Sequence, residues 1–325
     1  MNKIRRQMLI GSAIVGAGIG SNVFANTGFP TRAVKVVIPY PPGGPTDIVG
    51  RIVCTQLSEV FKQPFTIENK PGASGMIGAD QVAKANPDGY TILINVSGQL
   101  VNPYLYKNMT HNPAKDFAPI TNLASTPIQL ITSANSPIKT VKELVDLCRA
   151  EPGKHSFASS SNGTPGHLTG ELFKTLAKLD VTHIPYKGSA PAVTDVIGGQ
   201  VTFMFDSMPS SIGLVTSGKL RSLGVTSAKR VDVLPNVPTF SESGYPELNL
   251  STWYGMWAPA GTPASIIQIL NSEVVKVLAM PDTKDRLAKV QAAGVGDSPE
   301  AFAAFCKAES DKYAAIIRGA KITLQ

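Results

Sequence analysis

Apolar residues recur at two different spacings along the chain. Short apolar, β-branched runs at residues 34–39, 65–68 and 90–95 predict buried strands, and apolar residues three and four positions apart at 47–61 and 75–85 predict helices between them. A strand–helix–strand alternation of this kind is typical of a parallel sheet with helices on its faces. The first part of the chain therefore predicts an α/β unit.

The same alternation begins again near residue 128. Further strands are expected at 128–132, 156–159, 201–205, 220–226 and 250–257, and further helices at 141–149, 166–178, 190–198, 211–217, 264–279, 283–293 and 299–318. We expect the run at 250–257 to return to the first unit. The pattern thus predicts two α/β units with two chain crossings, near 123–126 and 248–252, as in a hinged, two-lobed protein.

The first 25 residues have the order of a cleavable export signal. A basic start that contains Arg5 and Arg6 precedes an uncharged stretch at 8–20, and small residues precede Asn26. Because that stretch is too short to span a bilayer, we expect a signal peptide at 1–25 and a periplasmic mature chain. A buried N-terminal helix is the alternative, and the paired arginines leave both the Sec and the twin-arginine export routes open.

Charge and composition point away from nucleic acids, metals and cofactors. The formal net charge is +7, and three positive charges lie in the expected signal peptide, which leaves the mature chain near +4 (7 − 3). It has no block of Lys and Arg of the kind that binds nucleic acid. Cys54, Cys148 and Cys306 form neither a disulfide framework nor a zinc pattern, and the four histidines lack a metal-ligand spacing. We therefore expect no metal, no cofactor and no nucleic-acid partner.

Three glycine-bearing loops each join a predicted strand to a predicted helix. They are YPPGGPTD at 40–47, NKPGASG at 69–75 and SSSNGTPG at 159–166. Glycine lets the backbone approach a ligand closely, and the free N–H groups and dipole of a helix start attract anions. Ligands of open parallel sheets bind at such strand ends, so the three loops could converge on one anionic solute. An ordinary strand-to-helix turn is the alternative for each loop taken alone.

Five stretches that span nearly the whole mature chain resemble the substrate-binding proteins of tripartite tricarboxylate transporters, the Bug family. They are YPPGGPTDIVGRIV (40–53), FTIENKPGASGMIGADQVAKANPDGYTIL (65–93), GTPGHLTGELF (163–173), HIPYKGSAPAVTDVIGGQVTFMFD (183–206) and LPNVPTFSESGYP (234–246). The resemblance implies an α/β, two-lobed type II periplasmic-binding-protein fold with a hinge and an interlobe ligand cleft. Residues 26–124 and 250–325 would form lobe 1, and residues 125–249 would form lobe 2.

The resemblance also implies a monomeric solute-binding protein that captures a small carboxylic acid for the membrane components of such a transporter. The main-chain amides of the first and third loops would hold the acid, with bridging water. The implied ligand-binding residues are Tyr40, Pro41, Gly43, Thr46, Asp47, Ala73, Ser74, Ser161, Asn162, Gly163, Thr164, Tyr186 and Asp206. Asp47 could instead stabilise only its helix dipole, and Asp206 could be a helix cap or part of a hinge ion pair. Pro45 and Ser161 depart from the family pattern, which commonly has glycine at both positions.

Hinge closure around the ligand, without catalysis, is the function that these features favour. An exported serine hydrolase acting on a small ester or amide, with Ser74 or Ser161 as nucleophile, is the alternative. The chain lacks a G-x-S-x-G motif, and no His and acid are recognisably placed to serve either serine. The effector domain of a transcription regulator is disfavoured by the export signal. We expect satisfied structural roles for the four histidines, with orientation of the third loop as the alternative for His167. We expect Lys187 to lie at the solvated edge of the cleft.

Overall fold

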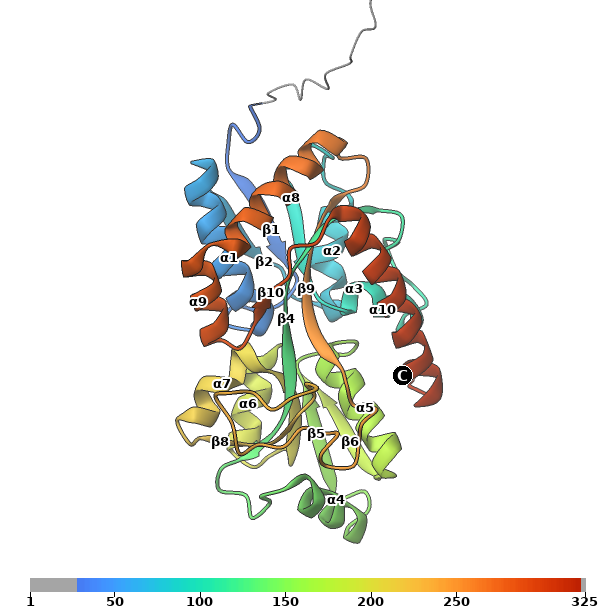
Figure 1. The fold of residues 1–325 in the computed structure, drawn as a ribbon. Coiled ribbons are helices and arrows are strands. Elements are labelled where there is room, and N and C mark those ends of the chain that lie inside the picture. The colour runs from blue at the N-terminus through green and yellow to red at the C-terminus, as the bar shows by residue number, and fades with distance from the viewer. Residues whose placement is uncertain (1–27, 323–325) are drawn as a thin grey trace, which may run out of the picture.

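The computed structural model describes residues 28–322, which form two sheets joined by one long strand (Figure 1). The expected signal peptide at 1–25 lies outside the described residues. The strands of the first half, in spatial order, are β2 (Phe65–Asn69), β1 (Val34–Ile38), β3 (Thr91–Asn95) and β9 (Ser251–Pro259). The first three are parallel, as the sequence pattern predicts, and β9 pairs antiparallel with β3.

The strand β4 (Phe117–Ser133) runs through both halves. It pairs antiparallel with β9 from Phe117 to Pro127, and with β7 and β8 from Ile128 onward. The other strands are β5 (His155–Ser159), β6 (Val181–Pro185), β7 (Phe203–Ser207) and β8 (Leu220–Val225) in the second half, and the short β10 (Ala293–Gly294), which pairs with the first-half part of β4. Leu250 packs in the core of the second half, and Ser251 pairs with Pro127. The chain therefore passes between the halves in two adjacent segments.

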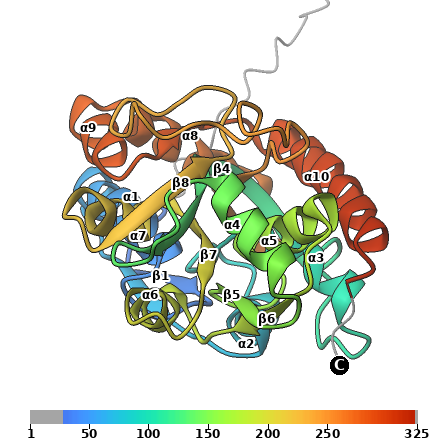
Figure 2. The same ribbon diagram turned by 90° about the horizontal axis from the view of Figure 1, so that it is seen from below.

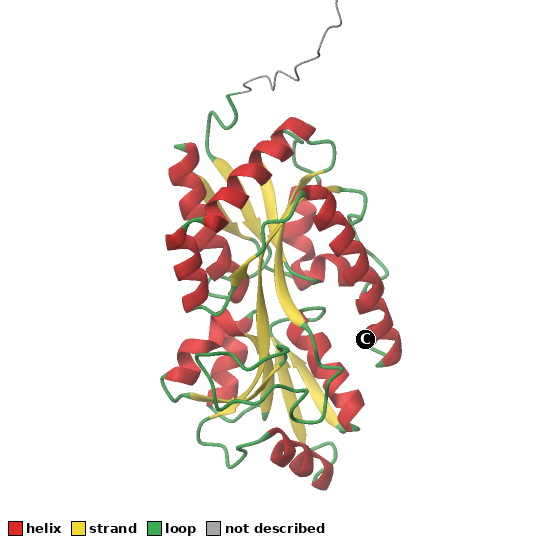
Figure 3. Ribbon diagram, viewed as in Figure 1, coloured by secondary structure: helices red, strands yellow, loops and turns green. Residues whose placement is uncertain are grey.

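Helices cover both faces of the first-half sheet (Figure 3). One face carries α1 (Pro45–Phe61), α8 (Ala264–Ala279) and α9 (Pro281–Lys289), and the other carries α2 (Met76–Ala83), α3 (Gly98–Leu105) and α10 (Pro299–Gly319). Val49, Val53 and Leu57 recur every four residues in α1 and are fully buried in the core that α1 shares with α8. Burial of each such side chain contributes about 1.5–3 kcal/mol, so this stripe fixes α1 on the sheet.

The second half has the same layered arrangement, seen from below in Figure 2. The helices α4 (Val141–Ala150) and α5 (Pro165–Ala177) cover one face, and α6 (Ser189–Ile197) and α7 (Met208–Thr216) cover the other. The ring of Phe173 in α5 meets the rings of Phe203, Phe205 and Phe240 edge to face, with centroids 5.5–6.4 Å apart. This aromatic cluster packs α5 against β7.

The predicted strands and helices occur within a few residues of their expected bounds, but several elements were not expected, including α3, the first part of β4, and β6. The helix α3 begins with Gly98 and contains Pro103, which are both poor helix formers. The first part of β4 contains Pro119 and Pro127, and proline within an apolar run argues against a strand. The strand β6 carries few apolar residues. In each case tertiary packing overrides a weak local signal.

Two further features of the described residues concern membrane-spanning helices and the cysteines. Among residues 28–322, no single helix is long and apolar enough to cross a bilayer; α8 and α9 reach that length and composition only together, with a 73° bend between them. All three cysteines are free thiols, and Cys54 and Cys148 are buried.

Candidate functional site

A small, largely enclosed cavity of about 30 Å³ lies between the two halves, and we call it the inner cavity. Val96 follows β3, Phe205 and Asp206 belong to the end of β7, and Thr252 lies near the start of β9; all four line the cavity. The remaining walls come from the first and third loops and from the turn after β6. The cavity thus lies at the carboxyl ends of parallel strands, where open α/β sheets bind ligands.

Four helices begin at the inner cavity. The N-cap residues of α1, α5, α6 and α7 are Gly44, Thr164, Gly188 and Ser207, and all of them line it. The first-turn N–H groups of a helix have no intrahelical acceptor, and the helix dipole places partial positive charge there. Within the part of the chain that the structure describes, no Arg, Lys or His lines this cavity. The attraction for an anion therefore comes from the main chain.

The first loop, residues 40–47, is held in shape by Asp47. Its carboxylate accepts hydrogen bonds from the Gly43 N–H at 2.9 Å, from the Asn69 amide at 2.9 Å, and twice from Arg51 at 2.8 and 2.9 Å. Burial opposes ionisation of this carboxyl, but the donors from Arg51, Gly43 and Asn69 outweigh it and hold the pKa of Asp47 below its usual range. Asp47 therefore braces the loop, and the Gly43 N–H is already occupied within it.

The Tyr40 hydroxyl is a buried polar group that has no partner among the described residues. A Cβ added at Gly98 or Gly75 would lie 2.9 or 3.4 Å from this oxygen, so the two glycines leave room for the phenol. Burial raises the pKa of Tyr40 well above its usual value, which keeps the hydroxyl protonated as a donor. Because buried polar groups almost always have partners, an unpaired hydroxyl on a cavity wall is a candidate donor to a ligand.

The third loop, residues 159–166, is organised by its own side chains. The hydroxyls of Ser159 and Thr164 donate to the Ser161 carbonyl at 3.1 and 2.7 Å, and the Gly163 N–H donates to Nδ1 of His167 at 3.1 Å. Gly166 packs on the Phe205 carbonyl so closely that a Cβ would overlap it. The loop is therefore rigid, and its Gly163 N–H, like that of Gly43, is used internally. His167 therefore helps to orient the loop.

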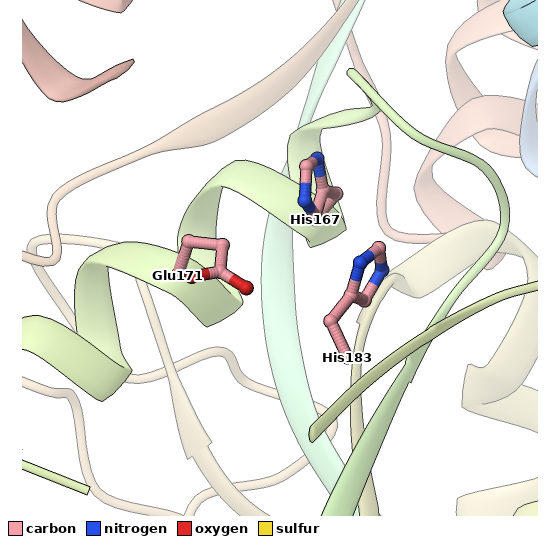
Figure 4. A group of neighbouring side chains, drawn as sticks. All are labelled: His167, Glu171 and His183. Carbon is pink, nitrogen blue, oxygen red and sulfur yellow. The ribbon is translucent and has the colours of Figure 1, made fainter. Parts of the chain in front are cut away.

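Figure 4 shows His167 and Glu171 one turn apart on α5, with His183 of β6 facing them. Their ligand-type atoms lie within 4.8 Å of one another, a spacing that raises the question of a metal site. However, Nδ1 of His167 accepts the Gly163 N–H, which places the imidazole proton on Nε2 and leaves that ring without a free lone pair. The Lys174 ammonium also lies 3.6 Å from the Glu171 carboxylate. The donor set fits a brace for the third loop rather than a metal centre.

The histidine pair also contacts a serine. Nε2 of His183 lies 2.7 Å from the Ser159 hydroxyl, and the rings of His183 and His167 stack with centroids 4.1 Å apart. Burial lowers the pKa of His167 to about 4, and burial together with neighbouring His167 and Lys174 lowers the pKa of His183 to about 2. Both rings are therefore neutral near pH 7. Ser159 itself is fully buried, so no substrate can reach it.

A wider space, which we call the outer chamber, opens beside the inner cavity with a volume of about 350 Å³. The two spaces share Tyr40, Pro41, Ser160 and Gly188. One wall of the outer chamber is the second loop, where Ala73 and Ser74 have φ angles of 45° and 55°. Such strain at non-glycine residues is typical of sites where surrounding contacts fix the backbone.

Among the described residues, the two halves touch across the cleft near Gly188, Gly163 and Ser161. A Cβ added at Gly188 would lie 2.9 Å from Cγ of Pro41, and one added at Gly163 would lie 3.0 Å from Oδ1 of Asn102. The Ser161 hydroxyl donates to the Ser74 hydroxyl at 3.3 Å, and the latter lies 2.5 Å from the Tyr106 hydroxyl. The structure therefore has its cleft closed, and two glycines permit the close approach.

The residues that the sequence analysis named fall into three groups. The inner cavity is lined by Tyr40, Pro41, Thr46, Thr164 and Asp206. The outer chamber is lined by Tyr40, Pro41, Ala73, Ser74, Ser161 and Tyr186, together with Lys187 at its exposed edge. Neither space is lined by Gly43, Asp47, Asn162 or Gly163, although all four lie in the two loops that flank the cleft. The hydroxyl of Tyr186 donates to Asp195 at 2.6 Å.

The sequence pattern alone did not predict a fourth loop, the turn after β6, although the family resemblance named its Tyr186. Gly188 and Ser189 of this turn line the inner cavity, and Gly188 has a φ of 117°, which side-chain-bearing residues rarely adopt. The motif PYKGS carries the same signal as the other three loops, a glycine and a hydroxyl at a helix start. The loop was not recognised because β6 was not predicted.

Comparison with known proteins agrees with this architecture. The model of the tripartite tricarboxylate transporter family receptor matches residues 49–322. BugT of Bordetella pertussis is 35% identical over 326 residues, which cover 99% of this chain and 100% of BugT. The structure of R. palustris Rpa4515 with adipate is 36% identical, with a TM-score of 0.89, and the match covers 91% of this chain and 100% of that one.

The structure of the periplasmic binding protein BugD is also 36% identical, with a TM-score of 0.87 and the same coverage, 91% of this chain and 100% of BugD. These likenesses confirm the predicted α/β periplasmic-binding-protein fold and the resemblance to the Bug proteins. The family match covers most of the described residues, including the second and third loops and the turn after β6, and it begins just after the first loop. The chain belongs to the tripartite tricarboxylate transporter receptor family.

Proposed function

We propose that this chain is a periplasmic receptor that captures a small carboxylic acid in the cleft, with one carboxylate in the inner cavity, and presents it to the membrane components of a tripartite tricarboxylate transporter. The observation that carries the proposal is the convergence of four helix N-termini on one enclosed space that, within residues 28–322, no basic side chain lines. Membership of a receptor family supports it, as does the relative Rpa4515, which was solved with adipate.

Hinge closure is the proposed mechanism. Lobe 1 would comprise residues 26–124 and 250–325, and lobe 2 residues 125–249, with the continuous strand β4 and the start of β9 as the connection. A ligand in the inner cavity contacts loops from both lobes, so it binds the closed form more tightly than the open form. That difference in affinity shifts the population toward the closed form, which the membrane partner would recognise.

The proposed ligand-binding residues act in two ways. Main-chain N–H groups at the starts of α1 and α5, together with the Tyr40 hydroxyl, would donate directly to the acid, with Pro41 and Thr164 shaping the wall. Asp47 would act through the first loop, which it braces. The other proposed positions, which shape the two flanking loops, the outer chamber or the cavity floor, are Gly43, Thr46, Ala73, Ser74, Ser161, Asn162, Gly163, Tyr186 and Asp206.

We propose that the protein binds without turnover, and without a metal or cofactor. The hydroxyls of Ser74 and Ser161 bond to other hydroxyls, and the one Ser–His contact in the described residues that could suggest a hydrolase joins Ser159 to His183. That serine is inaccessible, and a histidine with a pKa of about 2 is too weak a base to activate it near neutral pH. Unchanged ligand after long incubation with pure protein is the expected result, and product formation would overturn the proposal.

The proposal also covers export of the chain and its oligomeric state. Residues 1–25 would be removed on export by the Sec or the twin-arginine route, and the mature chain would act as a monomer. The relative BugD is a periplasmic binding protein, which supports a periplasmic location.

A matched-ligand screen tests the proposed function. Thermal shifts of the mature protein would be measured with a panel of carboxylic acids, including adipate, malate, glutamate and benzoate, and with the neutral amide of each. An acid at about 100 times its dissociation constant stabilises a protein by roughly 2.7 kcal/mol, whereas the matched amide should give no shift. Equal shifts with acid and amide, or no shift with any acid, would overturn the proposal.

A further inference from the structure

Asp206 is a buried carboxyl on the wall of the inner cavity. It is the second-to-last residue of β7, and only 3% of its surface is exposed. Oδ1 accepts a hydrogen bond from the Ser189 hydroxyl at 2.5 Å, and Oδ2 accepts one from the Ser210 hydroxyl at 2.6 Å. These serines lie in the first turns of α6 and α7, so Asp206 holds two helix starts at the cavity.

Among the described residues, no basic side chain faces Asp206. From β4, Gln129 lies opposite it in the sheet and donates to Ser211 of α7. From β9 and the first loop, the phenols of Tyr254 and Tyr40 are buried, and burial raises the pKa of both. The other nearby charges lie outside the inner cavity: Arg51 pairs with Asp47, and Lys187 lies at the edge of the outer chamber.

A carboxylate ligand would therefore bring a second negative charge into an enclosed space that already holds one carboxyl. Two carboxylates in one site share a proton, because they cannot both ionise without repulsion in a low dielectric. The partners of Asp206 accommodate either state, since a serine hydroxyl can donate to the ionised carboxylate and accept from the protonated one. Burial already raises the pKa of Asp206 above its usual range, and the hydrogen bonds from Ser189 and Ser210 only partly offset this.

We propose that Asp206 takes up a proton from solvent when the ligand binds, so that the cleft accepts an anionic acid together with one proton. This inference rests on the proposed function. The proton goes to a carboxylate oxygen of Asp206, and no other bond is made or broken. Asp206 thereby sets the charge of the ligand complex, and it disfavours ligands that place a second ionised group in the inner cavity.

Because proton uptake by Asp206 is coupled to ligand binding, it determines how the ligand affinity depends on pH. Affinity is highest below the pKa of Asp206 in the free protein, where its carboxyl is protonated before and after binding. It falls by up to about tenfold per pH unit until the pH exceeds the pKa in the complex, where a lower plateau begins. Between these limits about one proton is taken up per ligand bound.

Isothermal titration calorimetry of the mature protein measures both quantities. Adipate, malate, glutamate and benzoate would be titrated between about pH 5.5 and 8, in phosphate and in Tris, whose different heats of ionisation reveal the number of protons exchanged. We expect uptake of about one proton at the steepest part of the pH profile. The substitution Asp206→Asn should abolish the uptake and flatten the profile, while Asp146→Asn, at an exposed carboxylate on α4, should leave both unchanged.

Each outcome decides between the proposals. Binding without proton uptake, or uptake that persists in Asp206→Asn, would overturn the role of Asp206 and leave the proposed function intact. Failure of all four acids to bind at every pH would overturn the proposed function and this inference with it. If circular dichroism shows that Asp206→Asn does not fold, the proton count of the wild-type protein decides alone, because zero uptake there contradicts the inference.

Discussion

Replacing Asp47 by Asn tests how the first loop is held. The carboxylate receives four hydrogen bonds while its side chain is 3% exposed, and the Asn amide would present a donor where one acceptor oxygen stood. Two bonds are then lost, and hydrogen bonds to a charged group contribute about 1.5–3 kcal/mol each. Arg51 is 53% exposed and regains water, which offsets part of the loss. We therefore expect Asp47→Asn to lower the free energy of unfolding by about 2–4 kcal/mol at pH 7.

Urea unfolding of the mature protein across pH measures this effect. The folded-state pKa of Asp47 is lowered, so its stabilising contribution is fully present above the unfolded pKa of about 3.9 and is lost as the pH falls through the folded pKa. The gap between wild type and Asp47→Asn should therefore be full at neutral pH and shrink below about pH 4. Asp146→Asn, which removes an exposed pair with Lys142, should cost less than about 0.5 kcal/mol. A gap below about 1 kcal/mol at pH 7, or one that widens in acid, would refute the bracing role.

Three further predictions concern closure, charge and export. Gly188→Val should weaken binding of the acid found in the screen by about tenfold or more, because its side chain would meet Pro41 in the closed cleft; unchanged affinity in calorimetry would show that the halves need not meet there. Lys187→Ala should change the affinity less than about threefold, since this side chain lies at the exposed edge of the outer chamber, and a tenfold loss would mean that a side-chain charge holds the anion. Intact-mass measurement of periplasmic protein should show loss of residues 1–25, and a full-length cytoplasmic species would contradict the export signal.

The sequence patterns predicted the strands, helices and cleft loops better than the side-chain contacts between them. The first three loops were expected at the cleft because each follows an apolar run and begins a helix with glycine, and the structure brings them to the inner cavity or the outer chamber. Their role as ligand-binding loops stays a prediction. The helix α3, which places Asn102 against Gly163, was not foreseen because Gly98 and Pro103 argue against a helix.

The direction of individual donors also lay beyond sequence reasoning. A glycine at a helix start indicates a free N–H, yet the N–H groups of Gly43 and Gly163 are taken by Asp47 and His167, each four residues along the chain. Such local capture depends on side-chain rotamers that no spacing rule specifies. The sequence therefore indicates which loops carry N–H donors. The structure shows that the donors left available to a ligand are the N–H groups of the helix first turns.

The most direct test of the central claim is a crystal structure of the mature protein with the tightest-binding acid from the screen. We expect one carboxylate of the ligand in the inner cavity, within hydrogen-bonding distance of main-chain N–H groups in the first turns of α1 and α5, with no Arg or Lys side chain in contact. A ligand carboxylate paired with Lys187 in the outer chamber, or bound outside the cleft, would contradict the account.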